Sequence, residues 1–171
     1  AITKCKAEEY IMDWGNGICL RLATVFGSSP RMRTDLLVND FVYKTITEGC
    51  LVLFQSKFKR NYIHVRDIAY TFVHCIENYD KLNGGVFNVG LSDANLNKME
   101  LATKIKEYFP KLVIIENEFS TDIDNRNYIV SNDKLEATGW KPRYTIEDGI
   151  EELIQAYEMV ITDNNKKYTN L

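Results

Sequence analysis

The stretch ICLRLATVF, residues 18–26, is an apolar run that only Arg21 and Thr24 interrupt, and Gly27 follows it. A short run of this kind, rich in branched side chains and bounded by glycine, predicts a buried strand over Ile18–Phe26. The segments on either side of this strand decide the fold class.

Strands and helices alternate outward from this run. Before it, apolar positions at helical spacing predict a helix from the first residues to Trp14, ended by Gly15 and without an N-cap, because Ala1 already lies inside the pattern. Further helices are predicted at 35–48, 66–79, 97–109 and 145–160, where Asn97 with Glu100 and Thr145 with Asp148 form capping pairs. Further strands are predicted at 51–54, 60–65, 85–90 and 112–116, with a short extended piece at 127–131. This alternation predicts an α/β fold with parallel strand pairing.

Composition narrows the class of protein. The chain has 171 residues and a formal net charge of -3, which fits one domain or a domain plus part of another. The weak acidity of the chain argues against a nucleic-acid partner. Basic residues do cluster at 57–61, but such a cluster is typical of a solvated turn. No apolar run is long enough to span a membrane.

The four cysteines show neither metal-site nor redox-pair spacing: Cys5, Cys19, Cys50 and Cys75. They could form two disulfides, but most lie in apolar periodic runs. We therefore expect reduced, buried thiols and a cytoplasmic protein.

Candidate ligand-binding residues follow strand ends, because ligands of open α/β sheets bind outside the carboxyl ends of the strands. Phe26-Gly27 and Asn88-Val89-Gly90 occupy such positions, and Arg60 opens another strand. Arginine offers a bidentate fork to phosphate, so Arg60 is either an anion ligand or a solvated surface arginine.

Other polar residues have simpler explanations. A lysine on a helix, such as Lys4, is usually solvated. His64 and His74 have no second histidine or carboxylate pair at ligand spacing, so packed or surface roles are favoured and no metal site is expected. Asp67 lies where a helix is predicted to begin, which favours a capping role over that of a base.

Five segments in order resemble the extended short-chain dehydrogenase/reductase family, and more narrowly its NAD-dependent nucleotide-sugar epimerases and dehydratases. The segments are AITKCKAEE, LRLATVFG, RNYIHVRDIA, FNVG and NYIVSNDKLEATGWKPRYTIEDGIEELI. Each segment alone is a weak signal, but their order is specific, and the resemblance extends from Ala1 to about Val160.

The resemblance implies that the chain is incomplete. The family carries a Tyr-x-x-x-Lys pair on one helix, and if Lys4 is that lysine, the tyrosine falls immediately before Ala1. Residues 1–171 would then be the C-terminal portion of an epimerase/dehydratase, mixing the end of a Rossmann-type parallel sheet with a smaller α/β substrate-binding lobe. The N-terminal NAD-binding half would be absent.

The resemblance also implies roles for individual residues. Lys4 would bind the nicotinamide ribose of NAD (or NADP) and lower the pKa of the tyrosine, with Leu22 and Ala23 beside the nicotinamide. The partner would be a nucleotide diphosphate sugar. Its contacts would come from Thr24 (where many relatives have Asn), Asn39, Val52, Phe54, Arg60, Asn88 and Arg126.

The activity implied is oxidation of a sugar hydroxyl, followed by epimerisation, dehydration or decarboxylation. Because relatives often dimerise through the Tyr-Lys helix, a homodimer is expected. Two alternatives remain open: a non-catalytic nucleotide-sugar binding or interaction module, and one half of a split enzyme. Against the module, an isolated half-sheet would expose unpaired backbone.

Overall fold

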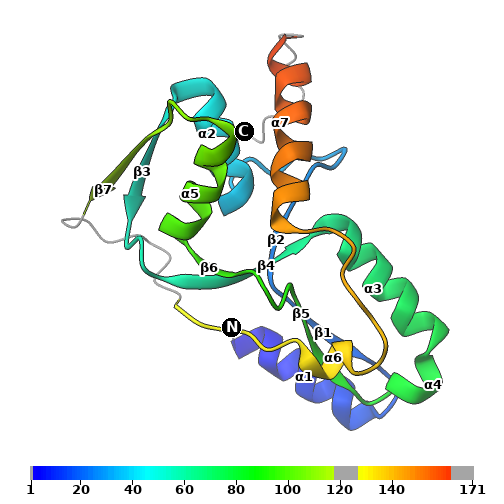
Figure 1. Ribbon diagram of the computed structural model, residues 1–171. Helices are drawn as coiled ribbons and strands as arrows, with labels where there is room; N and C mark the ends of the chain where they lie inside the picture. Colours follow the sequence, from blue (N-terminus) through cyan, green and yellow to red (C-terminus); the bar gives the residue numbers. More distant parts are fainter. Residues whose placement is uncertain (1, 118–126, 163–171) are drawn as a thin grey trace.

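The computed structural model describes residues 2–117 and 127–162 and shows an α/β fold in which three small sheets follow one another (Figure 1). The first sheet is a parallel pair, β1 (Cys19–Leu22) and β5 (Val86–Val89). In the second sheet, β4 (Lys59–His64) lies between parallel β2 (Thr24–Phe26) and antiparallel β6 (Asn95–Asn97). The third is a parallel pair, β3 (Cys50–Phe54) and β7 (Val113–Asn117). Parallel pairing in all three confirms the predicted fold class.

Helices cover these sheets from different sides. α1 (Ile2–Trp14) lies along the β1–β5 pair, whereas α5 (Lys98–Tyr108) and α2 (Leu37–Glu48) pack beside β3 (Figure 1). α7 (Ile146–Thr162) packs against α2, and α3 (Val65–Glu77) continues directly from β4. Two single-turn helices complete the set, α4 (Tyr79–Leu82) and α6 (Asp133–Glu136). Within the described residues, no helix is both long enough and apolar enough to cross a membrane.

The predicted strand over 18–26 is two strands in two different sheets. Its first half pairs with β5, and the Ala23 N–H still donates to the Val89 carbonyl at 2.9 Å. From Thr24 onward the chain pairs with β4 instead. The apolar run predicts burial correctly, but it cannot show that the pairing partner changes at Ala23.

Local capping signals place most helix ends where the sequence predicts them. Gly49 ends α2 with a φ of 67°, a conformation that favours glycine. The Asn97–Glu100 capping box is present, with bonds of 2.7 and 2.8 Å. Thr145 and Asp148 exchange hydrogen bonds at the start of α7.

The structure differs from the local expectations, or refines them, at three places. The predicted helix over 66–79 breaks at Asn78 into α3 and α4. The piece at 127–131 is not a strand, although the Tyr128 N–H donates to the Lys59 carbonyl at 3.1 Å. The cysteines are all free, as expected, but only Cys75 is buried and Cys5 is exposed.

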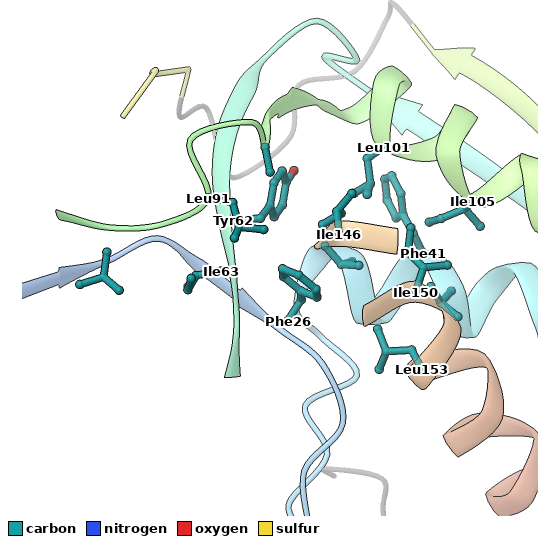
Figure 2. Close-up of a cluster of buried hydrophobic side chains, with 14 of the residues drawn as sticks. Phe26, Phe41, Tyr62, Ile63, Leu91, Leu101, Ile105, Ile146, Ile150 and Leu153 are labelled. Carbon is teal, nitrogen blue, oxygen red and sulfur yellow. The ribbon is translucent and has the colours of Figure 1, made fainter. Parts of the chain in front are cut away.

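One hydrophobic core joins the central sheet to three helices (Figure 2). Phe26 and Tyr62 come from adjacent strands, and α2, α5 and α7 supply many of the other large side chains. They include Phe41, Leu101, Ile105, Ile150 and Leu153. Burial of this apolar area, worth roughly 25 cal/mol per Å², fixes β2 and β4 against the helices and so fixes the residues at their ends.

Candidate functional site

The carboxyl ends of β1 and β5 bring three of the predicted site residues together. In the register of this pair, Arg21 is opposite Asn88 and Leu22 is opposite Val89. Ala23 follows directly and stays bonded to Val89. Leu22 is 43% exposed, so an apolar surface is available at this edge. Asn88 donates from Nδ2 to the Ser131 carbonyl at 3.0 Å, which ties the edge to the segment before α6.

Thr24 and Arg60 lie beside this edge. Thr24 pairs with Tyr62, and Arg60 precedes Tyr62 by two residues, which places it level with the end of β1. Arg60 is only 5% exposed. Because a guanidinium stays charged in proteins and charged side chains are rarely fully buried, this burial distinguishes Arg60 from an ordinary surface arginine.

The contact between α1 and β1 allows us to infer that Lys4 lies level with Ala23. The Glu8 carboxylate accepts hydrogen bonds from Arg21 Nε and Nη2 at 2.9 and 2.5 Å, which fixes α1 against β1. Lys4 is one helical turn earlier, about 6 Å along the axis, and Ala23 is about 6.6 Å further along the strand than Arg21. The two displacements have the same direction because α1 and β1 are joined by a tight turn. Lys4 is exposed, and it has no ion pair or hydrogen bond to the other described residues.

The other predicted site residues are not part of this group. Both polar atoms of the buried Asn39 amide bind the Gly27 backbone, at 3.1 and 3.2 Å. Val52 and Phe54 belong to the third sheet, where Val52 is 48% exposed opposite Ile115. Arg126 lies outside the described residues.

Sequence reasoning missed a close approach next to Arg60. Asn61 is fully buried, and its Nδ2 donates to the Leu91 carbonyl at 2.6 Å. The Asn61 side chain passes so close to Gly90 that a Cβ there would lie 1.6 Å from Asn61 Oδ1. The only hint in the sequence is Gly90 itself, the glycine after Asn88-Val89, which does not reveal that Asn61 is the residue packed against it.

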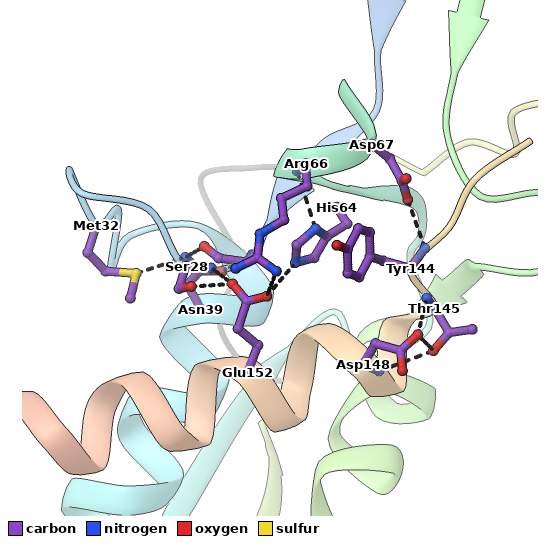
Figure 3. Close-up of polar contacts among 11 residues, drawn as sticks. Ser28, Met32, Asn39, His64, Arg66, Asp67, Tyr144, Thr145, Asp148 and Glu152 are labelled. Carbon is purple, nitrogen blue, oxygen red and sulfur yellow. Dashed lines mark hydrogen bonds and ion pairs between the residues drawn. The ribbon is translucent and has the colours of Figure 1, made fainter. Parts of the chain in front are cut away.

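Sequence reasoning also missed a polar cluster formed by Ser28, His64, Arg66 and Glu152 (Figure 3). The Glu152 carboxylate accepts from the Ser28 backbone N–H at 3.0 Å and from its hydroxyl, and ion-pairs with Arg66 at 3.2 Å. His64 Nε2 faces the same carboxylate at 3.4 Å. The Ser28 hydroxyl therefore donates to Glu152 and not to His64. The cluster connects α7 to the loop after β2 and to the start of α3.

The N-cap of α3 is His64 and not Asp67, for which the sequence predicts that role. His64 is the residue that caps α3, because its Nδ1 accepts from the Arg66 backbone N–H at 3.2 Å. Burial lowers the pKa of His64, and the Glu152 carboxylate opposes that shift. Asp67 is not the cap: its buried carboxylate accepts the backbone N–H groups of Arg143 and Tyr144 at 2.9 and 3.1 Å. It therefore fixes the chain that enters α7.

The fold and the site define an α/β protein of the Rossmann-like type, in which Asn88 lies near the carboxyl end of β5 and the buried Arg60 lies at the start of β4. The match to the NAD dependent epimerase/dehydratase family covers residues 1–90. The chain belongs to this family.

Two curated relatives and two solved structures extend the comparison. The chain is 30% identical over 123 residues to an uncharacterized protein of Schizosaccharomyces pombe, covering 58% of this chain and 32% of that one. It is 22% identical over 165 residues to CDP-paratose 2-epimerase of Salmonella typhi, covering 88% and 49%. The chain therefore spans about a third to about a half of the length of these curated relatives.

The structural likeness reaches a TM-score of 0.77 with UDP-glucose 4-epimerase of Thermotoga maritima bound to UDP-glucose, at 21% identity, covering 94% of this chain and 53% of that one. It is 0.74 with RMD of Pseudomonas aeruginosa complexed with NADPH, at 19% identity, covering 92% and 55%. At these identities the likeness shows the fold.

Proposed function

We propose that the chain is the C-terminal portion of an NAD-dependent nucleotide-sugar epimerase or dehydratase and binds the nucleotide diphosphate sugar. The observation that carries this proposal is the buried Arg60 beside Thr24, level with the β1–β5 edge where Asn88 lies. The Asn88 amide near the carboxyl end of β5, together with a buried guanidinium at the start of β4, suits a diphosphate. Family membership and the UDP-glucose bound to the Thermotoga maritima epimerase support the choice of ligand.

The remaining substrate contacts follow from position. Thr24 would lie near the sugar or its phosphate, and the exposed side of β3 at Val52 and Phe54 would lie along the nucleobase. Arg126 stays a prediction outside the described residues. Asn39 also stays a prediction, although its amide already holds Gly27.

The residues present fit the nicotinamide part of NAD or NADP. Lys4 keeps an exposed ammonium group that can donate to ribose hydroxyls, and Leu22 offers exposed apolar surface to an aromatic ring. When bound, the cofactor supplies the acceptor for the hydride of the sugar carbon. Lys4 would also stabilise the phenolate of a tyrosine one helical turn earlier, which makes that phenol a usable base.

The longer protein that this proposal implies would carry the N-terminal cofactor-binding half and act as a cytoplasmic homodimer. Exposed Ile2, Tyr10 and Trp14 on α1 supply apolar surface for such a contact. The intact mass of the protein from its source tests this first. A mass near 35 kDa, about 130–150 residues more than this chain, supports it, whereas a mass near 19.8 kDa would favour a binding module or a split enzyme.

Ligand binding tests the site directly. Titration calorimetry with nucleotide diphosphate sugars should show binding to the chain, and Arg60→Met should weaken it about tenfold or more, since a charged hydrogen bond contributes about 1.5–3 kcal/mol. Arg31→Met is the matched control, because Arg31 is exposed and lies between β2 and α2, outside the β1–β5 pair. Equal affinity of Arg60→Met and the control would refute the phosphate role. For the longer protein, binding without turnover of any nucleotide sugar with NAD would reduce the function to that of a binding module.

A further inference from the structure

Gln55 has a backbone conformation that its residue type disfavours. Its φ is +50°, and it is the only residue other than glycine with positive φ among the described residues. A side chain in this left-handed region crowds the following carbonyl, so glycine is the residue usually found there. The fold needs the turn, because the Phe58 N–H donates to the Gln55 carbonyl at 3.2 Å, but it needs no glutamine side chain for it.

The side chain of Gln55 adds a second cost. Its Oε1 is buried and has no hydrogen-bond partner among the residues that the structure describes. A buried acceptor without a donor is unfavourable, and glycine at this position would avoid both costs. A residue that is strained and also unsatisfied indicates a group that a ligand completes.

A cavity of about 240 Å³ lies at this point, lined by residues that include Leu53, Gln55, Phe58 and Asn117. Clefts that hold a whole small molecule measure about 300–1,000 Å³, so this cavity suits one part of a ligand, such as a single ring system. It lies at the carboxyl end of β3, and Leu53, not Val52 or Phe54, is the β3 residue among those that line it.

The chain geometry relates this cavity to Arg60. The Gln55–Phe58 turn keeps the Cα atoms of these two residues within about 7 Å, and Arg60 is two residues further, at most about 7 Å more. Gln55 and Arg60 are therefore close enough for one nucleotide to reach both, with its diphosphate at Arg60 and its base at Gln55.

We propose that Gln55 accepts a hydrogen bond from an N–H group of the nucleobase and so determines which nucleotide the site prefers. This inference rests on the proposed function and extends it, since it assigns base preference to one side chain. Two polar neighbours of Gln55 already make hydrogen bonds within the chain. Ser56 donates to the Glu116 carboxylate, and Lys98 donates to the Phe54 carbonyl at 2.7 Å.

Calorimetric titration of the full chain with UDP, dTDP, CDP, GDP, ADP and inorganic pyrophosphate tests the proposal. Wild type should prefer one kind of base by about tenfold, where uracil and thymine count as one kind because both offer the same N3–H group. Gln55→Gly, which relieves the strain, and Gln55→Met, which keeps the length without the amide, should both lose that preference and keep their affinity for pyrophosphate. Thermal unfolding controls for folding, because Gln55→Gly should melt at or above the wild-type temperature.

The outcomes separate this proposal from the one on which it depends. Equal affinity of wild type for all five nucleotides, or an unchanged preference in both variants, overturns the role of Gln55 and leaves the diphosphate site intact. Failure of every nucleotide and of pyrophosphate to bind overturns both proposals.

Discussion

Replacing Gly90 by alanine tests the packing that holds Arg60 in place. The added Cβ would lie 1.6 Å from Asn61 Oδ1, 2.8 Å from its Cγ and 3.0 Å from Asn132 Oδ1. These distances are far inside van der Waals contact, so Asn61 or the end of β5 must move. Both asparagines are buried, and neither can turn out into solvent.

The cost follows from what Asn61 would lose. Its Nδ2 is bonded to the Leu91 carbonyl at 2.6 Å, and displacement leaves a buried donor and acceptor unpaired, at about 1–3 kcal/mol. Overpacking adds about 1–3 kcal/mol if the backbone shifts instead. We expect a loss of about 3 kcal/mol in the free energy of unfolding, or roughly 6–12 °C in Tm for a chain of this size.

Urea and thermal unfolding measure this loss, and two further variants identify its cause. Gly49→Ala is the control for an added methyl group in open space, where only the positive φ opposes alanine, so it should cost about 1–2 kcal/mol. In an Asn61→Ala background the two shortest contacts are absent and only that with Asn132 remains. Gly90→Ala should then cost less by at least about 1.5 kcal/mol, a coupling typical of residues in contact. An equal cost in both backgrounds, or a Gly90→Ala protein as stable as wild type, would refute the steric argument.

Two further predictions concern the start of α3. Asp67→Asn replaces one acceptor oxygen with an NH2 group that faces the N–H of Arg143 or Tyr144. Chemical denaturation should therefore show a loss of about 2 kcal/mol in the free energy of unfolding. Unchanged stability would contradict the role of Asp67 in holding these two residues. The pKa of His64 is lowered in the folded state. As the pH drops below about 6.5, the ordinary pKa of histidine, His64 therefore binds a proton more readily in the unfolded chain than in the folded one. The contribution of His64 to the free energy of unfolding should fall below that pH and stay level above it. His64→Asn, which keeps a side-chain cap acceptor for the Arg66 N–H, should remove this part of the pH dependence, and an identical profile in the variant would rule His64 out as its origin.

The features predicted correctly from sequence are those with local causes. The Asn97–Glu100 box lies within four residues, and the glycine after α2 ends that helix by its own conformational preference. The apolar periodicity of 145–160 likewise defines α7, whose bounds are Ile146–Thr162. Each depends on the spacing of neighbouring residues, which the sequence displays directly.

The features that were missed depend on contacts between distant segments. Asp67 was interpreted as a cap because it stands near a helix start, but its partners are 76 and 77 residues away. The hydrogen bond from Asn61 to the Leu91 carbonyl, beside the tight fit against Gly90, joins residues 30 positions apart. The strained φ of Gln55 has no signature at all, since glutamine is not the residue that such a position favours.

The change of strand partner at Ala23 explains why the candidate site lies where it does. Up to Ala23 the chain is bonded to β5, and from Thr24 it is bonded to β4. Ligands of α/β sheets bind where the strand order changes at the carboxyl ends, because the neighbouring strands diverge there. Asn88 on one partner and Arg60 on the other then flank the same point of the chain, so the apolar run 18–26 both builds two sheets and positions the residues that would hold a diphosphate between them.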